Sequence, residues 1–206
     1  MKLSSRALTT YGAALVMFFT MLSASQEANA MGNKEEVPHG ITSCEEMIGV
    51  HKYQVSRVLV KAAPCQVQSV LTDYEHTTQV FPELKKCQIV SESGPEKNIA
   101  FTANAPGSLF SFDYVLQVRE IPGYIEWHRV SGAFKQNEGF WKLEPTDDGR
   151  STLVTYAKFI DGGLFVPQMF VNKELKASMP QVLANLKVSA EQNSRVAHVD
   201  SPNKLR

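Results

Sequence analysis

The feature that most constrains the fold of this chain is a series of short strand-like segments that runs from Lys86 to Phe159. Within each segment apolar and polar residues alternate, as they do in strands that bury one face. The segments are separated by turn sequences of a few residues, such as "SGPEKN", "IPG" and "TDDGR". Such short connections join antiparallel neighbours and cannot make the long crossovers of a parallel sheet. This region therefore predicts an antiparallel meander.

Helical patterns flank the meander on both sides. Before it, the strand-like "YQVSRVLVKA" is followed by "APCQVQSVLTDY", in which Pro64 stands at the first position of a helix. The sequence "YEHTTQVFPEL" predicts a second short helix that ends at Pro82. After the meander, an apolar stripe predicts a long helix from about Val166 to Ala190. Pro180 predicts a kink or a fresh start of this helix near Ser178.

The predicted fold class is α+β. We expect an antiparallel sheet of six to seven strands, two short helices after the first strand, and the long C-terminal helix packed on the sheet. The chain has no repeat and no low-complexity linker, so we expect one domain over about residues 50–190. Residues 31–49 and 191–206 are polar and weakly patterned, and we expect both segments to be loosely ordered.

The first 30 residues have the pattern of a secretory signal peptide. Lys2 and Arg6 precede an uncharged, mostly apolar run, and Ala28 and Ala30 form a small-x-small cleavage site. A membrane anchor is the alternative, but the run is shorter than the ~20 apolar residues that span a bilayer. We therefore expect an exported protein, periplasmic or extracellular, that begins at Met31 after cleavage and has no stable membrane insertion.

The charge balance of the chain indicates what kind of partner it has. The sequence carries 21 Lys and Arg residues and 21 Asp and Glu residues, a formal net charge of +0. Nucleic acids and anionic membrane surfaces are bound through basic patches, and the sequence contains no such patch. We therefore expect no nucleic-acid partner, and a small hydrophobic or amphiphilic ligand instead.

Three cysteines, Cys44, Cys65 and Cys87, lie in the expected mature chain. Because three is an odd number, at most one internal disulfide forms and one thiol remains. The spacing does not decide which two residues pair. Cys65 stands at a predicted helix start, where a reactive thiol is conceivable, but no histidine lies near it in sequence. A disulfide or a buried thiol is therefore the favoured interpretation.

Alternation also assigns the strand residues to faces. In "LFSFDYVLQVRE" the apolar side chains from Phe110 to Val118 share one side, which we take as the inner face. In the next strand Trp127 aligns with Arg129, so an arginine stands on an apolar face. In "GAFKQNEGFWKLEP" the inward residue is Trp141. Aromatic side chains on neighbouring strands thus face the long helix, either as an ordinary core or as the wall of a ligand cavity.

The order of elements resembles that of the START-like, helix-grip superfamily, and the motifs resemble its polyketide cyclase/dehydrase and coenzyme Q-binding branch (SRPBCC). The motifs are "VLTDYEHTTQVFPELKKCQIV", "IEWHRVSGAFKQNEGFWKLEPTDDGRSTLVTY" and "MPQVLANLK", and the resemblance covers about residues 52–190. It implies a curved antiparallel sheet wrapped around the long helix, with a hydrophobic cavity between them. It also implies that the aromatic wall faces a lipid, fatty acid, quinone or polyketide-like ligand.

We therefore expect the inner face and the long helix to supply the ligand contacts. Arg129 is the polar member of this set, and it must meet a carboxylate, reach water or bind a ligand head group, because an unpaired buried guanidinium is costly. The expected ligand-binding residues are Phe110, Phe112, Tyr114, Leu116, Trp127, Arg129, Trp141, Phe170, Leu175, Met179 and Leu183.

The sequence favours a binding or carrier protein over an enzyme. It contains no HExxH, CxxC, G-x-S-x-G or phosphate-loop motif, so we expect no metal, no cofactor and no catalytic constellation. The alternative is a cyclase or dehydratase that shapes an apolar substrate, with Tyr114 and Arg129 as its polar groups. A third possibility is a periplasmic interaction module with a closed core. A sizeable internal cavity would favour the first two interpretations.

Overall fold

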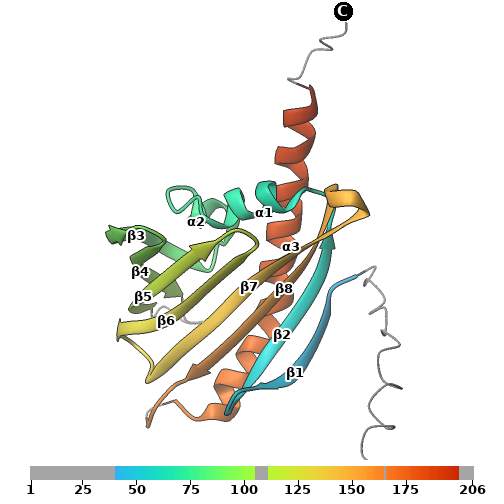
Figure 1. Ribbon diagram of the computed structural model, residues 1–206. Coiled ribbons are helices and arrows are strands. Elements are labelled where there is room, and N and C mark those ends of the chain that lie inside the picture. Colours follow the sequence, from blue (N-terminus) through green and yellow to red (C-terminus); the bar gives the residue numbers. More distant parts are fainter. Residues whose placement is uncertain (1–39, 105–110, 165, 200–206) are drawn as a thin grey trace, which may run out of the picture. The chain divides into compact units, whose positions relative to one another are not determined.

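A computed structural model describes residues 40–104, 111–164 and 166–199. These residues form eight strands, three α-helices and one short 3-10 turn at Asp147–Gly149 (Figure 1). The helices are α1 (Pro64–Leu71), α2 (Thr77–Val80) and α3 (Gln168–Val199). The strands are β1 (Thr42–Ile48), β2 (His51–Val60), β3 (Leu84–Ser93), β4 (Glu96–Asn104), β5 (Ser111–Ile121), β6 (Tyr124–Gly132), β7 (Gln136–Thr146) and β8 (Ser151–Asp161).

The strands form one antiparallel sheet in the order β1-β2-β8-β7-β6-β5-β4-β3. Strands β3 to β8 follow one another as hairpins, which confirms the predicted meander. The last of them, β8, pairs with β2, so that Val58 lies opposite Val154 although the two are far apart in sequence. Each face of the sheet therefore combines side chains from both ends of the domain.

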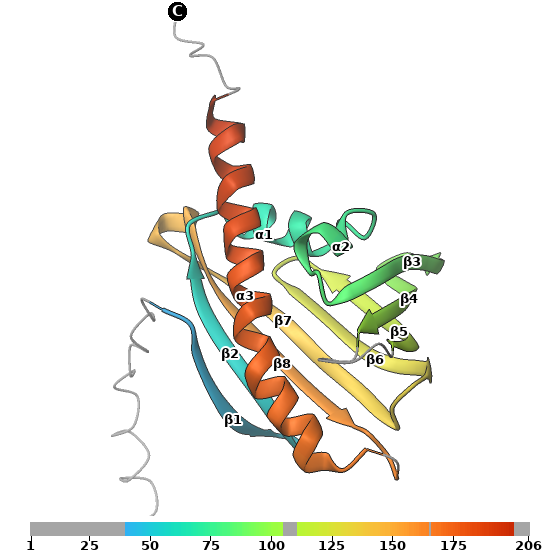
Figure 2. The same ribbon diagram turned by 180° about the vertical axis from the view of Figure 1, so that it is seen from behind.

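Helix α3 lies along one face of this sheet, in front of β2, β8 and β7 when seen from behind (Figure 2). Its apolar stripe is buried there at intervals of three and four residues, as helical periodicity requires. Met179, Leu183 and Leu186 expose 1% or less of their surface. Burying a side chain of this size contributes roughly 1.5–3 kcal/mol, so the stripe fixes the helix on the sheet. The predicted helix-grip architecture is thus confirmed.

Helices α1 and α2 lie beside α3 at one end of the sheet (Figures 1 and 2). Pro64 opens α1 as predicted, and the side-chain oxygen of Gln66 accepts a hydrogen bond from the Ala63 backbone N–H at 3.0 Å. This bond satisfies one of the backbone donors at the helix start. Val67 and Leu71 are buried, so α1 closes the space between α3 and the sheet.

Two segments are more ordered than the sequence predicts. Strand β1 lies within the segment 31–49, which we expected to be loosely ordered, and it is the strand beyond the six to seven expected. Its side chains are mostly exposed, so it lacks the apolar alternation by which strands are recognised. It is held by backbone pairing along β2 and by an ion pair between Arg57 and Glu46 at 2.7 Å.

Helix α3 also differs from its predicted form. It begins at Gln168, after Pro167, and it runs past Ala190 to Val199 into the segment expected to be loosely ordered. An ion pair between Lys187 and Glu191 at 2.8 Å, four residues apart, supports this polar extension. The helix continues through Pro180 without a fresh start.

Candidate functional site

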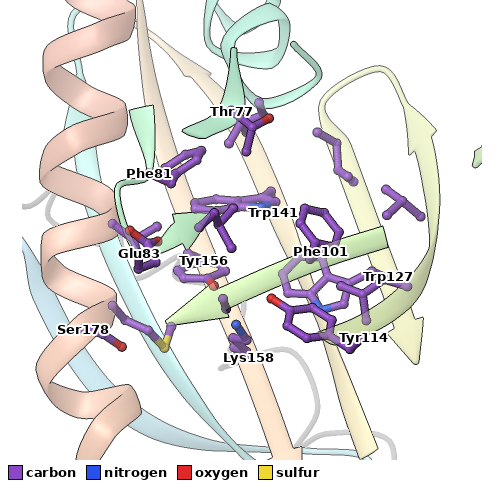
Figure 3. Close-up of a pocket in the computed structure, with 18 of the residues that line it drawn as sticks. Thr77, Phe81, Glu83, Phe101, Tyr114, Trp127, Trp141, Tyr156, Lys158 and Ser178 are labelled. Carbon is purple, nitrogen blue, oxygen red and sulfur yellow. The ribbon is translucent and has the colours of Figure 1, made fainter. Parts of the chain in front are cut away.

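An internal cavity of about 200 Å³ lies between the inner face of the sheet, α3 and the α1–α2 segment (Figure 3). For comparison, an apolar cavity of about 150 Å³ is large enough to bind benzene. Most of the lining side chains are aromatic or aliphatic, and few are charged. The cavity is lined by Leu71, Tyr74, Thr77, Phe81, Glu83, Leu84, Phe101, Ala103, Tyr114, Leu116, Val118, Ile125, Trp127, Trp141, Tyr156, Lys158, Leu175, Ser178, Met179 and Val182.

The strand residues reach the cavity because side chains alternate along each strand. On β5, Tyr114, Leu116 and Val118 share the inner face, as the sequence pattern predicted. On β6 and β7 the inward positions fall on Ile125, Trp127 and Trp141. On β8 they fall on Tyr156 and Lys158. The α1–α2 segment adds Tyr74 and Phe81, which no periodicity in the sequence pointed to.

An aromatic wall forms one side of the cavity. The rings of Trp141 and Tyr156 stack with centroids 3.9 Å apart and an interplanar angle of 7°. The Trp127 ring lies 6.0 Å from that of Tyr156, and its Nε1 donates to Asn137 Oδ1 at 3.4 Å. These contacts fix the rings as a rigid surface, against which a flat or extended apolar molecule can pack.

Gly139 leaves the space that the Trp127 ring occupies in this wall. It pairs with Trp127 across β6 and β7, and a Cβ atom at this position would come within 2.3 Å of the indole ring. The same atom would come within 2.3 Å of the backbone oxygen of Ala157. Any larger residue must therefore push the ring or the strands away.

Two ionisable side chains, Glu83 and Lys158, also line the cavity. Burial lowers the pKa of Lys158 below that of a free lysine, and the negative charge of Glu83 opposes this shift. Burial likewise raises the pKa of Glu83, and a backbone hydrogen bond to its carboxylate and the charge of Lys158 oppose this shift. In the part of the chain that the structure describes, no ion pair within 4.0 Å joins the two groups. Both groups are therefore free to interact with cavity contents.

Two tyrosine hydroxyls complete the polar region of the cavity. Burial raises the pKa of both Tyr114 and Tyr156, and the nearby charge of Glu83 raises each pKa further. Both phenols therefore remain protonated and can donate a hydrogen bond. Figure 3 shows these hydroxyls and the amine of Lys158 pointing into the same part of the cavity. The site thus combines an apolar wall with a small polar cluster.

The structure brings about half of the predicted ligand-binding residues to the cavity. The residues that line it are Tyr114, Leu116, Trp127, Trp141, Leu175 and Met179. Phe112 instead packs on Phe134, with ring centroids 5.3 Å apart. Leu183 is fully buried in the core, and Phe170 is 58% exposed near the start of α3. Phe110 lies outside the described residues.

Arg129 was expected in the cavity, and the structure corrects this prediction. It stands opposite Leu116 on the inner side of β6, but a bulge at the next residue shifts the register between β5 and β6. Pairing of β6 with β7 ends at His128, so Arg129 lies where the strands separate. Its Nη2 donates to the carbonyl oxygen of Gly132 at 2.8 Å and not to the cavity.

The charged lining residues absent from the predicted site are Glu83 and Lys158. Lys158 had a usable signal, because Val154, Tyr156, Lys158 and Ile160 alternate on one side of β8. Glu83 had none, since it lies in the connection between α2 and β3, where no periodicity assigns a direction.

The three cysteines are separate thiols in the structure. Cys44 and Cys65 are exposed, and burial raises the pKa of Cys87 to about 11. In the described ranges, no group of three His, Cys, Asp or Glu side chains is placed to hold a metal ion. Across those same ranges, no helix has the length and apolar character needed to cross a membrane.

Comparisons with known structures give the same architecture. A STAR-related lipid transfer protein from Xanthomonas axonopodis aligns with a TM-score of 0.63 and 20% identity, over 74% of this chain and 94% of that chain. Human STARD10 aligns with a TM-score of 0.64 and 10% identity, over 79% and 74%. The Zhui aromatase/cyclase from Streptomyces sp. R1128 aligns with a TM-score of 0.56 and 14% identity, over 80% and 99%. A search of curated protein sequences found no match.

These likenesses, together with the sheet that grips α3, define a START-like domain. Residues 60–187 match the family described as "Polyketide cyclase / dehydrase and lipid transport". The chain belongs to this family, and the resemblance noted in the sequence motifs is confirmed.

Proposed function

We propose that this protein is an exported carrier that binds one hydrophobic or amphiphilic molecule in the cavity. The observation that carries the proposal is an unfilled volume of about 200 Å³ inside a START-like domain. Protein cores are normally packed as densely as organic crystals. A volume of this size left unpacked between the sheet and α3 favours a ligand over the closed core of an interaction module.

The lining indicates the chemical class of the ligand. An apolar tail fits the wall of Trp141, Tyr156 and Trp127, because burying it there removes apolar surface from water on both sides. A single polar head group fits the cluster of Glu83 and Lys158, because both side chains line the cavity and no ion pair within 4.0 Å joins them in the described residues. A lipid, fatty acid, quinone or polyketide-like molecule combines such an apolar part with a polar group. The names of similar proteins, a lipid transfer protein and an aromatase/cyclase, are consistent with it.

Export is proposed from the pattern of the first 30 residues, which resembles a signal peptide. Ligand binding is tested by purifying the protein from its host under native conditions and identifying co-purifying molecules by mass spectrometry. We expect about one apolar molecule per protein chain. Recovery of a protein without bound lipid that also takes up no fluorescent fatty acid would contradict the proposal.

The second candidate function is a cyclase or dehydratase that acts on an apolar substrate in the same cavity. It is favoured by the convergence of Glu83, Lys158, Tyr114 and Tyr156, since proton transfer needs such groups beside a bound substrate. A carrier releases its co-purified ligand unchanged, whereas an enzyme converts it. Comparing the bound molecule before and after incubation separates the two.

A further inference from the structure

Lys158 occupies a position on the inner face of β8 that apolar residues fill on either side. Along this face Val154, Tyr156 and Ile160 expose 0%, 6% and 7% of their surface. A lysine in such a row normally extends its amine to water, but Lys158 lines the cavity. Within the described residues its amine has no hydrogen-bond partner, and Glu83 is the charge that acts on it. The amine is therefore presented to whatever the cavity holds.

We propose that Lys158 is a reactive amine that forms a reversible imine with an apolar aldehyde or ketone bound in the cavity. This inference rests on the proposed function, because it requires that the cavity binds an apolar ligand. It names the ligand class more narrowly, as a molecule with a carbonyl group at the polar end.

The surroundings of Lys158 supply what imine formation requires. Only a neutral amine is nucleophilic, and burial favours the neutral form of Lys158. Burial also favours the protonated form of Glu83, whose carboxyl lines the same cavity and can exchange a proton with the reacting group. The protonated phenols of Tyr114 and Tyr156 can donate hydrogen bonds to the carbonyl oxygen.

The reaction is balanced without an oxidant or a reductant. The lone pair of Lys158 Nζ forms a bond to the carbonyl carbon, and the carbonyl π electrons move to the oxygen, which takes one of the two protons of the nitrogen. The resulting carbinolamine loses its hydroxyl as water, with a proton from Glu83, and the nitrogen gives its second proton back to the Glu83 carboxylate. The products are an imine and one water molecule, and hydrolysis reverses each step.

The test is reductive trapping with octanal. Full-length protein is incubated with octanal and sodium cyanoborohydride at pH 7.5, and the labelled lysine is located by peptide mass spectrometry. We expect about one octyl group per chain, on Lys158, and suppression of this label by excess octanol, which fills the cavity but has no carbonyl. Label spread equally over the surface lysines, or label at Lys158 that octanol does not suppress, would overturn the inference.

Two variants serve as matched controls. Lys158→Arg keeps a long basic side chain but cannot form an imine, and it should lose the octanol-sensitive label at least tenfold while keeping the wild-type circular dichroism. Lys142→Met removes an exposed lysine from the neighbouring strand β7 and should leave the label unchanged. Glu83→Gln should slow labelling. An unchanged octanol-sensitive label in Lys158→Arg would overturn the inference.

Failure of the inference and failure of the proposed function give different results. If octanol displaces a fluorescent fatty acid from the cavity but octanal never labels Lys158, the carrier function stands and the imine is wrong. The same conclusion follows if octanoate binds through Lys158 and octanal leaves it unlabelled, since the amine then acts as a cation. If neither octanol nor octanal displaces the probe, both proposals are wrong.

Discussion

At the scale of single residues, the cavity depends on a few positions where a small change has a large effect. Gly139 is one, because the Trp127 ring and the strand β8 backbone occupy the space that its side chain would fill. Glu83 and Lys158 are others, because burial in the cavity disfavours the charged form of each side chain. These residues determine the shape of the wall and the polarity of the cavity.

We predict that Gly139→Ala destabilises the protein by about 1–3 kcal/mol, the usual effect of overpacking a core. The added methyl group must displace Trp127, so the variant should also bind a fluorescent fatty acid more weakly. Urea unfolding and probe titration measure the two effects. Gly40→Ala is the control, since a Cβ there has nothing within 4 Å. Equal stability of the two variants would show that Gly139 is not tightly packed.

The second residue-scale prediction concerns pH. A carboxyl whose pKa is raised in the folded state stabilises the fold fully below its unfolded pKa, which is near 4.5 for Glu83. This contribution is lost as the pH rises through the folded pKa. Other carboxyls, such as Glu46 and Asp161, have lowered pKa values and act in the opposite direction. The contribution of Glu83 is therefore measured as the difference in stability between wild type and a variant without this carboxyl.

From pH 4.5 upwards, we expect the stability of wild type to fall relative to that of Glu83→Gln, because only wild type has a carboxyl to ionise in the cavity. Urea unfolding at several pH values measures this difference. A difference that stays constant from pH 4.5 to 8 would mean that Glu83 titrates as it does in water.

At the scale of elements, α3 is the helix that covers the cavity, and Pro180 divides it. Proline has no backbone N–H, so the carbonyl of Lys176 lacks its helical partner. Leu175 and Met179 in the first half line the cavity, as does Val182 in the second half, whereas Leu183 and Leu186 pack in the core. The first half therefore depends more on the contents of the cavity, and it is the candidate for a mobile lid.

We predict faster hydrogen exchange in residues 168–178 than in residues 181–188, with a smaller difference when a fluorescent fatty acid is bound. Ligand in the cavity would add apolar contacts to the first half. Pro180→Ala restores the missing donor and should protect the first half without ligand. Equal protection of both halves in the wild type would leave Pro180 as a static irregularity.

Whether an element could be predicted depends on the signal that its sequence carries. The meander, α1 and α3 have strong periodicities, and all three form where predicted, although α3 extends past Ala190 to Val199. Strand β1 has exposed side chains and is held by backbone pairing with β2, which no sequence pattern reports. Arg129 was assigned to the correct side of β6, but the bulge after it and the end of the β6–β7 ladder depend on tertiary pairing. The position of Glu83 depends on the path of the connection between α2 and β3, and tertiary packing sets that path.

At the scale of the whole molecule, a START-like domain is joined to a sequence with the pattern of an export signal. We propose that these 30 residues direct export and are then removed, so that the domain works outside the cytoplasm. We predict that protein recovered from its host has an intact mass corresponding to an N-terminus at Met31. A soluble product that still contains residues 1–30 would contradict export by this signal.

Filling the cavity with a larger side chain tests most directly whether the cavity binds an apolar ligand. Ala103 lines the cavity from β4, whereas Ala100 lies on the opposite face of the same strand. A fluorescent fatty acid is titrated into wild type, Ala103→Phe and Ala100→Phe, with circular dichroism as a check of folding. We predict saturable binding of one probe per chain to wild type and Ala100→Phe, and binding at least tenfold weaker to Ala103→Phe. No binding to wild type, or equal binding to both variants, would contradict a ligand site in this cavity.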